Sequence, residues 1–230
     1  MWPSADECAE LRDDPRLLFS YGWHPKQLLS GIGVTSRGNW EELSTLLGSE
    51  GCVSLGEVGL DYTKDTPTKE LQQTTLVKLL RLNARRRNLP VVIHCRDHPS
   101  DRGAAGGDCL AILRQELSRG HHIHRHCFDG SVDEFDSWRR AFPSCYFGIT
   151  GLATMDYCHR ELSVVISLIP EDRLLLETDS PFLKTRGEAS LHNSPLLLDK
   201  VARYVAKIRR TSLARVLEIT SHNARRCYRF

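Results

Sequence analysis

Val53-Ser54-Leu55-Gly56-Glu57 is a short apolar run that ends in a carboxylate, and three further stretches of the chain repeat this design. A short apolar run between turn residues is typical of a buried strand. Longer amphipathic stretches separate the runs, which indicates parallel strands joined by helices, with the polar ends gathered at one face. The recurrence predicts the metal site of a barrel enzyme. The other stretches are Val91-Val92-Ile93-His94, Ile123-His124-Arg125-His126 and Leu174-Leu175-Leu176-Glu177-Thr178-Asp179.

Composition and length limit the class of protein. The chain has 230 residues, of which 40% are hydrophobic, and this suits a single α/β domain over residues 1–230 with one core. A formal net charge of +2 argues against a strongly basic, purely electrostatic binder of nucleic acid. Local basic clusters such as Arg85-Arg86-Arg87 and Lys207-Ile208-Arg209-Arg210 are interpreted as solvated helix faces, with phosphate contacts as the alternative.

Cysteine usage and the amino terminus indicate the compartment. The eight cysteines contain no C-x-x-C pair and no zinc-finger spacing, so we expect reduced thiols in an intracellular protein. The first residues show no secretory signal pattern, and no run approaches the roughly 18 apolar residues of a membrane span. We therefore expect a protein of the nucleus or cytoplasm with no membrane contact. The sequence does not indicate its oligomeric state.

The periodicity of the chain predicts alternating strands and helices. This alternation predicts βαβ crossovers and a parallel sheet, and therefore an α/β fold of the TIM (β/α)₈ type. Six strands are visible where a closed barrel needs eight. The glycine-rich segment 97–108 is expected to be a flexible loop at the active face. The predicted strands are 17–23, 52–57, 91–94, 122–126, 145–149 and 174–178, and the predicted helices are 6–12, 40–47, 69–87, 109–117, 132–142, 161–169, 195–210 and 212–226.

Four residues carry the expected metal chemistry: Glu57, His94, His126 and Asp179. Two imidazoles and two carboxylates suit zinc, manganese or magnesium, and a catalytic site leaves a coordination position open for water or substrate. Each residue has an ordinary alternative explanation, since a histidine at a strand end is often a hydrogen-bonded structural residue and Asp179 precedes a Ser-Pro turn. Together, and with the glycines that flank Glu57, they favour a functional site.

Six ordered blocks of sequence resemble the TatD family of metal-dependent deoxyribonucleases, within the amidohydrolase superfamily. The resemblance runs from about residue 17 to the carboxyl terminus. It implies a TIM barrel that holds up to two divalent metal ions. The blocks are Gly22-Trp23-His24-Pro25, Gly56-Glu57-Val58-Gly59-Leu60-Asp61-Tyr62, Pro90-Val91-Val92-Ile93-His94-Cys95-Arg96, His126-Cys127-Phe128-Asp129-Gly130-Ser131, Glu177-Thr178-Asp179-Ser180-Pro181-Phe182 and Asn223-Ala224.

The resemblance also implies roles for individual residues. Glu57 would bridge the metals, and His94 and His126 would ligate one of them. Asp179 would ligate the other or receive the proton of the attacking water. His24 and Arg96 would hold a phosphate. The implied reaction is metal-dependent hydrolysis of phosphodiester bonds in DNA by an exonuclease-type enzyme. The enzyme would need one or two Mg, Mn or Zn ions. Its substrate would be single-stranded DNA or duplex ends, with RNA as a further candidate.

One block of the family is absent from this sequence. Members begin with a strand that ends in His-x-His, whereas here the first recognisable element leads to His24. We therefore expect that the first two strands are missing, that the sheet has open edges and an unfilled interior, and that the chain is a truncated form with weakened activity. Glu57, His94 and His126 would still hold one metal. The histidines at 122 and 124 are interpreted as interior or start-of-strand residues rather than substitutes.

Two other functions remain open on the sequence alone. The same scaffold serves hydrolysis of small esters, amides or lactones, because a fold does not fix a substrate. A non-catalytic remnant that binds nucleic acid is the second alternative, and the absent His-x-His block favours it.

Overall fold

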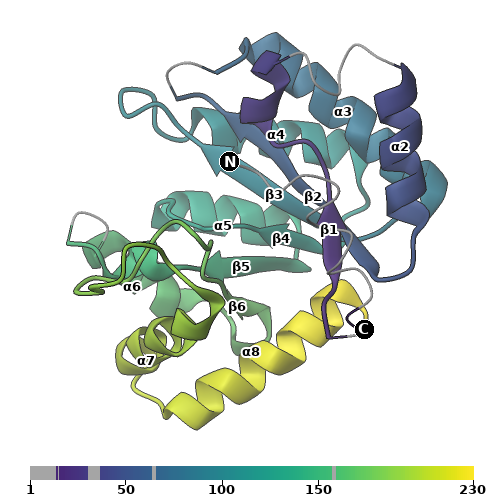
Figure 1. Cartoon of the computed structure of the whole chain (residues 1–230). Helices are drawn as coiled ribbons and strands as arrows, with labels where there is room; N and C mark the ends of the chain where they lie inside the picture. Colours follow the sequence, from purple (N-terminus) through teal and green to yellow (C-terminus); the bar gives the residue numbers. More distant parts are fainter. Residues whose placement is uncertain (1–13, 15, 31–36, 64–65, 157–158) are drawn as a thin grey trace.

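The computed structural model describes residues 14, 16–30, 37–63, 66–156 and 159–230. The predicted helix at 6–12 lies outside the described residues. Six strands form one parallel sheet in chain order, so the predicted α/β fold with a parallel sheet is confirmed (Figure 1). In the part of the chain that the structure describes, the two end strands do not pair with each other. The strands are β1 (Phe19–Tyr21), β2 (Cys52–Asp61), β3 (Val91–Arg96), β4 (Ile123–Arg125), β5 (Cys145–Ile149) and β6 (Leu174–Leu176).

Helices follow the same sequential order as the strands. Each α-helix contacts the next along the chain, so a layer of helices covers a layer of strands, as in a segment of a barrel. Hydroxyl side chains of Thr68, Ser131 and Ser212 accept the first free amides of three helices. The helices are η1 (Pro25–Ser30), α2 (Arg37–Gly48), α3 (Lys69–Arg86), α4 (Ala104–Glu116), α5 (Val132–Ala141), η2 (Gly151–Thr154), α6 (His159–Leu168), η3 (Glu171–Arg173), η4 (Pro195–Leu197), α7 (Leu198–Arg209) and α8 (Leu213–Tyr228).

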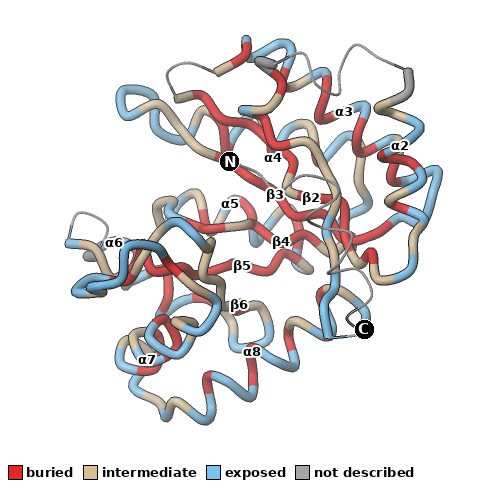
Figure 2. Tube along the Cα trace, viewed as in Figure 1, coloured by how far each residue is buried: buried red, intermediate tan, exposed pale blue. Residues whose placement is uncertain are grey.

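The main core lies between the helices and one face of the sheet, and burial is concentrated along the strands (Figure 2). Side chains alternate between the two faces of a strand. Ile123, Phe147 and Leu174 point to the helices and belong to the main core. The side chains that alternate with these residues along each strand therefore point to the other face of the sheet, which we call the inner face.

The inner face of β4–β6 is covered by the end of α8. Tyr146, Leu175 and Cys227 form a small second cluster there, and the ring of His122 donates to the Cys227 carbonyl over 3.0 Å. The expectation of an unfilled interior is therefore wrong for this part of the sheet, because the last turn of α8 packs against it.

Two predicted boundaries are wrong for local reasons. Helix α4 begins at Ala104, inside the predicted loop, because the Asp97 carboxylate accepts the amides of Gly103 (2.8 Å) and Ala105 (2.7 Å) at its start. Strand β2 continues past Glu57 to Asp61 because a register shift lets Val58 and the following residues pair with β3. Glu57 thus lies within its strand rather than at the end.

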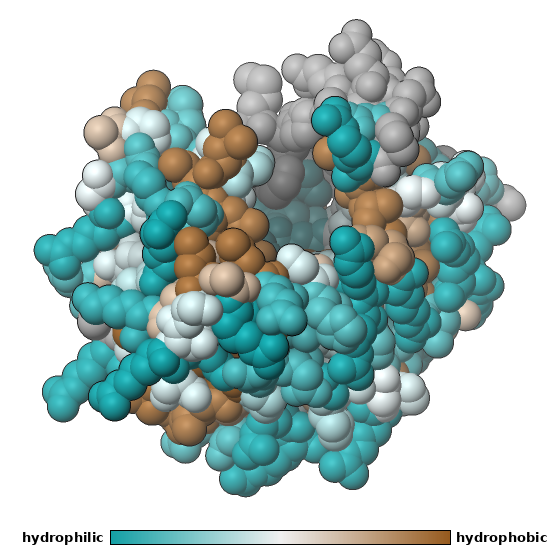
Figure 3. All heavy atoms as spheres, turned by 90° about the horizontal axis from the view of Figure 1, so that it is seen from below, coloured by the Kyte–Doolittle hydropathy of each residue, from teal (hydrophilic) through white to brown (hydrophobic). Residues whose placement is uncertain are grey.

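The molecular surface carries scattered apolar side chains. Phe182 is 59% exposed, Leu191 83% and Leu196 88%, and all three lie in the segment after β6. On the face seen in Figure 3, apolar side chains gather beside a hollow in an otherwise mostly hydrophilic surface. Among the described residues, none of the helices is long and apolar enough to cross a membrane.

Asn223 fixes α8 to the sheet and gives a test of this packing. Its buried side-chain amide donates to the carbonyls of Glu171 (2.7 Å) and Leu174 (2.8 Å). Asn223→Ala leaves both carbonyls without this donor, so we expect the free energy of unfolding to fall by about 2–4 kcal/mol in urea titration. The exposed neighbour His222 is the control, and His222→Ala should change the free energy by less than about 0.5 kcal/mol. Equal effects of the two substitutions would contradict this account.

Candidate metal centre

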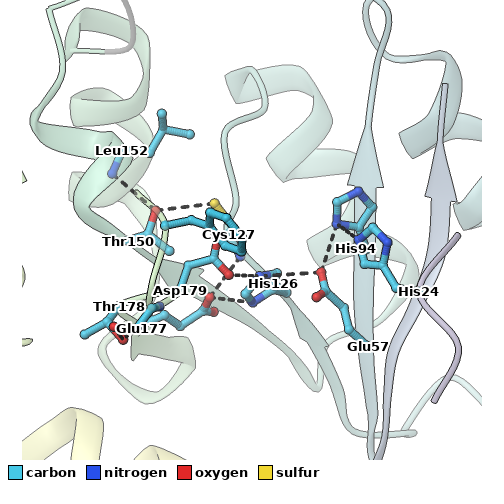
Figure 4. Close-up of polar contacts among 12 residues, drawn as sticks. His24, Glu57, His94, His126, Cys127, Thr150, Leu152, Glu177, Thr178 and Asp179 are labelled. Atoms are coloured by element: carbon cyan, nitrogen blue, oxygen red, sulfur yellow. Dashed lines mark hydrogen bonds and ion pairs between the residues drawn. The ribbon is translucent and has the colours of Figure 1, made fainter. Parts of the chain in front are cut away.

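Two histidines from neighbouring segments of the sheet converge on one carboxylate oxygen. Oε1 of Glu57, on β2, lies 2.8 Å from Nδ1 of His94 on β3 and 3.5 Å from Nε2 of His126, which follows β4 (Figure 4). Parallel pairing of β2, β3 and β4 brings these positions to the same end of the sheet. The structure therefore brings Glu57, His94 and His126 together, although Glu57 does so from within its strand rather than from the strand end.

Each of these histidines is anchored through its other ring nitrogen. Nε2 of His94 lies 3.1 Å from Oδ2 of Asp61, and Nδ1 of His126 lies 2.6 Å from Oε2 of Glu177. A carboxylate that accepts one ring N–H fixes the tautomer and the orientation of the imidazole, and metal-binding histidines are held in this way. The nitrogens that remain, Nδ1 of His94 and Nε2 of His126, both face Glu57.

Asp61 is a fully buried carboxylate held by its own strand end. Its Oδ1 accepts the backbone amide of Thr63 at 3.0 Å, and the ammonium of Lys26 lies 3.5 Å from Oδ2. Burial favours the neutral acid, but the hydrogen bonds from His94 and Thr63 outweigh burial and hold the pKa of Asp61 well below its usual range. Asp61 therefore stays an acceptor for the His94 ring at neutral pH.

His24, in the segment between β1 and η1, contacts the same group. Its Nε2 lies 3.3 Å from Nδ1 of His94, and its Nδ1 accepts the amide of Lys26 at 3.2 Å. Burial, with the charge of His94 adding to it, lowers the pKa of His24 to about 4, so the ring is neutral at pH 7. Because Nδ1 is an acceptor, Nε2 carries the proton in this neutral ring, and His24 presents a donor.

Asp179 occupies a turn opposite Glu57. It has a φ of 57°, in the left-handed region that aspartate tolerates, and its carbonyl accepts the amide of Phe182 at 2.8 Å. Its Oδ1 lies 3.2 Å from Nε2 of His126. The carboxylate is partly exposed and thus accessible to water.

The charges of the site favour a cation. Burial raises the pKa of Glu57, but the contact with His94 and the charge of His126 outweigh it and set the value at about 2. Burial likewise opposes the charged form of His126, whereas Glu177 and Asp179 raise its pKa well above the ordinary value. The raised pKa means that these carboxylates favour a second proton on His126, whereas the neutral imidazole that binds a metal has one proton and can satisfy only one carboxylate. A divalent ion beside Glu57 would compensate the negative charge of the remaining carboxylates.

The donor set fits such an ion. Glu57, His94 and His24 offer ligand atoms that lie within 4.8 Å of one another, and Nε2 of His126 faces the same Glu57 oxygen. Imidazole nitrogen and carboxylate oxygen are ligands of zinc and manganese, and Asp179 lies beside His126. A second metal-capable group, His124, His126 and Glu177, adjoins the first because Nε2 of His126 lies 3.5 Å from Oε1 of Glu57.

Other positions differ from the sequence interpretation. Arg96 ends β3, where its carbonyl accepts the amide of Tyr62 at 2.8 Å, and its half-buried side chain is not joined to Glu57 in the described contacts. Asp61 and Glu177 lie in two of the family-like blocks, but the sequence predicted no role for them. For Glu177 the signal is alternation along the strand, which places it on the same face as Leu175. No sequence signal indicated that Tyr228 of α8 contacts His124.

Comparison with known proteins gives a family match across nearly the whole chain. The family model described as TatD related DNase matches residues 3–229. The uncharacterized metal-dependent hydrolase YabD of Bacillus subtilis (strain 168) is 30% identical over 228 residues, which are 99% of this chain and 84% of YabD. The 3'-5' ssDNA/RNA exonuclease TatD of Dickeya dadantii (strain 3937) is 35% identical over 209 residues, which are 87% of this chain and 75% of that protein.

Solved structures agree with this match. YJJV, a TatD homolog from Escherichia coli K12, superimposes with a TM-score of 0.81 at 26% identity, over 96% of this chain and 80% of that one. A TatD family hydrolase from Entamoeba histolytica gives a TM-score of 0.80 at 23% identity, over 97% and 80% of the two chains, and supports the fold alone. The six-stranded sheet thus corresponds to part of a TIM barrel. The chain belongs to the TatD-related family of metal-dependent hydrolases.

Proposed function

We propose that this protein is a metal-dependent nuclease that hydrolyses phosphodiester bonds in DNA, removing nucleotides from single strands or duplex ends. The observation that carries the proposal is the convergence of His94 and His126 on Glu57, each anchored by a second, largely buried carboxylate. Relatives named as 3'-5' ssDNA/RNA exonucleases support a nucleic acid as substrate, with RNA as a second candidate.

Glu57, His94 and His126 would hold one divalent ion, of the Mg, Mn or Zn type. Such an ion lowers the pKa of bound water and neutralises charge on phosphate oxygens. The protein itself orients the ligands of the ion. Asp61 and Glu177 hold the two imidazoles in one orientation, so the ligand atoms are in place before an ion arrives.

Three residues around this centre would act on substrate and water. The Asp179 carboxylate, partly exposed beside His126, would accept the proton of the attacking water, or ligate a second ion. His24 is neutral and presents Nε2–H, which suits donation to a phosphate oxygen. Arg96, at the end of β3, would hold a phosphate through its planar fork.

Metal binding tests the ligand assignment directly. Glu57 contacts both histidines, so Glu57→Ala should weaken Mn²⁺ binding by at least about tenfold, measured as free Mn²⁺ by paramagnetic resonance during titration. Glu70→Gln, an exposed carboxylate on α3, is the control and should bind as the parent does. Unchanged binding in Glu57→Ala would show that the ion lies elsewhere.

Hydrolysis of end-labelled oligonucleotides tests the reaction. With Mg²⁺ or Mn²⁺ we expect stepwise loss of nucleotides from the 3' end of single-stranded DNA, abolished by a chelator and by Glu57→Ala. A matched RNA strand tests the second nucleic acid. Turnover of a small ester or lactone without any shortening of DNA would favour the other hydrolase function and contradict this proposal.

A further inference from the structure

Glu177 joins two histidines on the inner face of the sheet. Its Oε2 lies 2.6 Å from Nδ1 of His126 and accepts the amide of Cys127 at 3.1 Å, while its Oε1 contacts Nε2 of His124. The carboxylate lies between the two rings and is largely shielded from solvent. Each carboxylate oxygen thus meets one ring nitrogen, and an ionised carboxylate has only acceptor sites. Glu177 is therefore an acceptor for both rings.

The space for this contact depends on a glycine of β5. A Cβ built on Gly148 would lie 1.3 Å from Oε1 of Glu177 and 2.4 Å from Nε2 of His124. Any side chain at position 148 would thus occupy the place where the carboxylate meets the ring. The contact as it stands therefore requires glycine at position 148.

The contact chain continues to the last turn of α8. Nδ1 of His124 is hydrogen-bonded to the hydroxyl of Tyr228, and the two rings meet edge to face at 5.9 Å between centroids. Burial raises the pKa of Tyr228 well above its ordinary value, so the hydroxyl keeps its proton and can donate it to Nδ1. His124 then donates Nε2–H to Glu177, and His126 donates Nδ1–H to the same carboxylate.

We propose that Tyr228, His124 and Glu177 are positioning residues through which α8 fixes the ring of His126 and sets the metal affinity of the site. This rests on the proposed function, since it takes His126 as a metal ligand. His126 can present Nε2 to an ion only while Nδ1–H points to Glu177. Tyr228 and His124 restrict that carboxylate from the other side, and Asn223 fixes the helix that carries Tyr228.

The distances favour this hydrogen-bonded chain over an ion between His124, His126 and Glu177. A contact of 2.6 Å between Nδ1 of His126 and Oε2 of Glu177 is a charge-assisted hydrogen bond. Two ligands at about 2.0–2.2 Å from one ion lie about 2.8 Å or more apart in octahedral geometry and farther apart in tetrahedral geometry. The amide of Cys127 also occupies Oε2.

The test measures Mn²⁺ affinity and stoichiometry in the full chain. Glu177→Gln should weaken binding about 10- to 100-fold, and Tyr228→Phe, which removes only a hydroxyl, should weaken it at least about threefold. In the Glu177→Gln background, Tyr228→Phe should have no further effect, because the two act through one chain of contacts. Tyr204→Phe is the control, since its hydroxyl meets Ser163 on α6, away from the site.

Each other outcome contradicts a defined part of the account. If Tyr228→Phe binds Mn²⁺ as the parent does while Glu177→Gln binds it more weakly, then α8 does not affect the metal affinity. The proposed function would still stand. Additive losses in the double variant would mean that Tyr228 acts through general packing. His124→Gln is a second variant, which keeps a side-chain donor. If the parent binds two ions and this variant binds one, then His124, His126 and Glu177 form a metal site. A parent chain that binds no Mn²⁺ would overturn the proposed function itself.

Discussion

The opposition of two imidazoles across one oxygen of Glu57 is the constraint on which the rest of the site depends. His94 and His126 come from adjacent parallel elements, and each turns one ring nitrogen to Glu57 because Asp61 or Glu177 holds the other one. Four carboxylates, including Asp179, surround two rings in a largely buried space. Such a cluster is stable only when a cation or extra protons compensate its charge. The sheet holds the cluster in the form that an ion would bind.

The fold serves this arrangement through strand register and through α8. Register places Gly59 of β2 beside His94, where no Cβ would fit because the His94 carbonyl is 1.9 Å from the site that it would occupy. On the opposite side of the centre, Gly148 leaves room for Glu177 in the same way. The last turn of α8 then closes the inner face of β4–β6. Gly59, Gly148 and the last turn of α8 together determine where the two histidines lie.

Much of this could be predicted from the sequence, and the missing parts have physical reasons. Short apolar runs that end in Glu57, His94 and Asp179 predicted strands and a shared edge, because the carboxyl ends of parallel strands meet. The register shift that extends β2 to Asp61 depends on pairing with β3, which local periodicity does not encode. The contact between Tyr228 and His124 joins residues 104 positions apart, so only the packing of α8 reveals it.

The most direct measurement is a crystal structure of the chain soaked in Mn²⁺, with the ion located by its anomalous scattering. The account predicts a peak about 2.0–2.3 Å from Oε1 of Glu57, Nδ1 of His94 and Nε2 of His126, with Glu177 hydrogen-bonded to the opposite nitrogen of His126. A peak bound instead by Glu177, His124 and Nδ1 of His126 would contradict the assignment of Glu177 as an anchor. No peak at Glu57 would contradict the central claim.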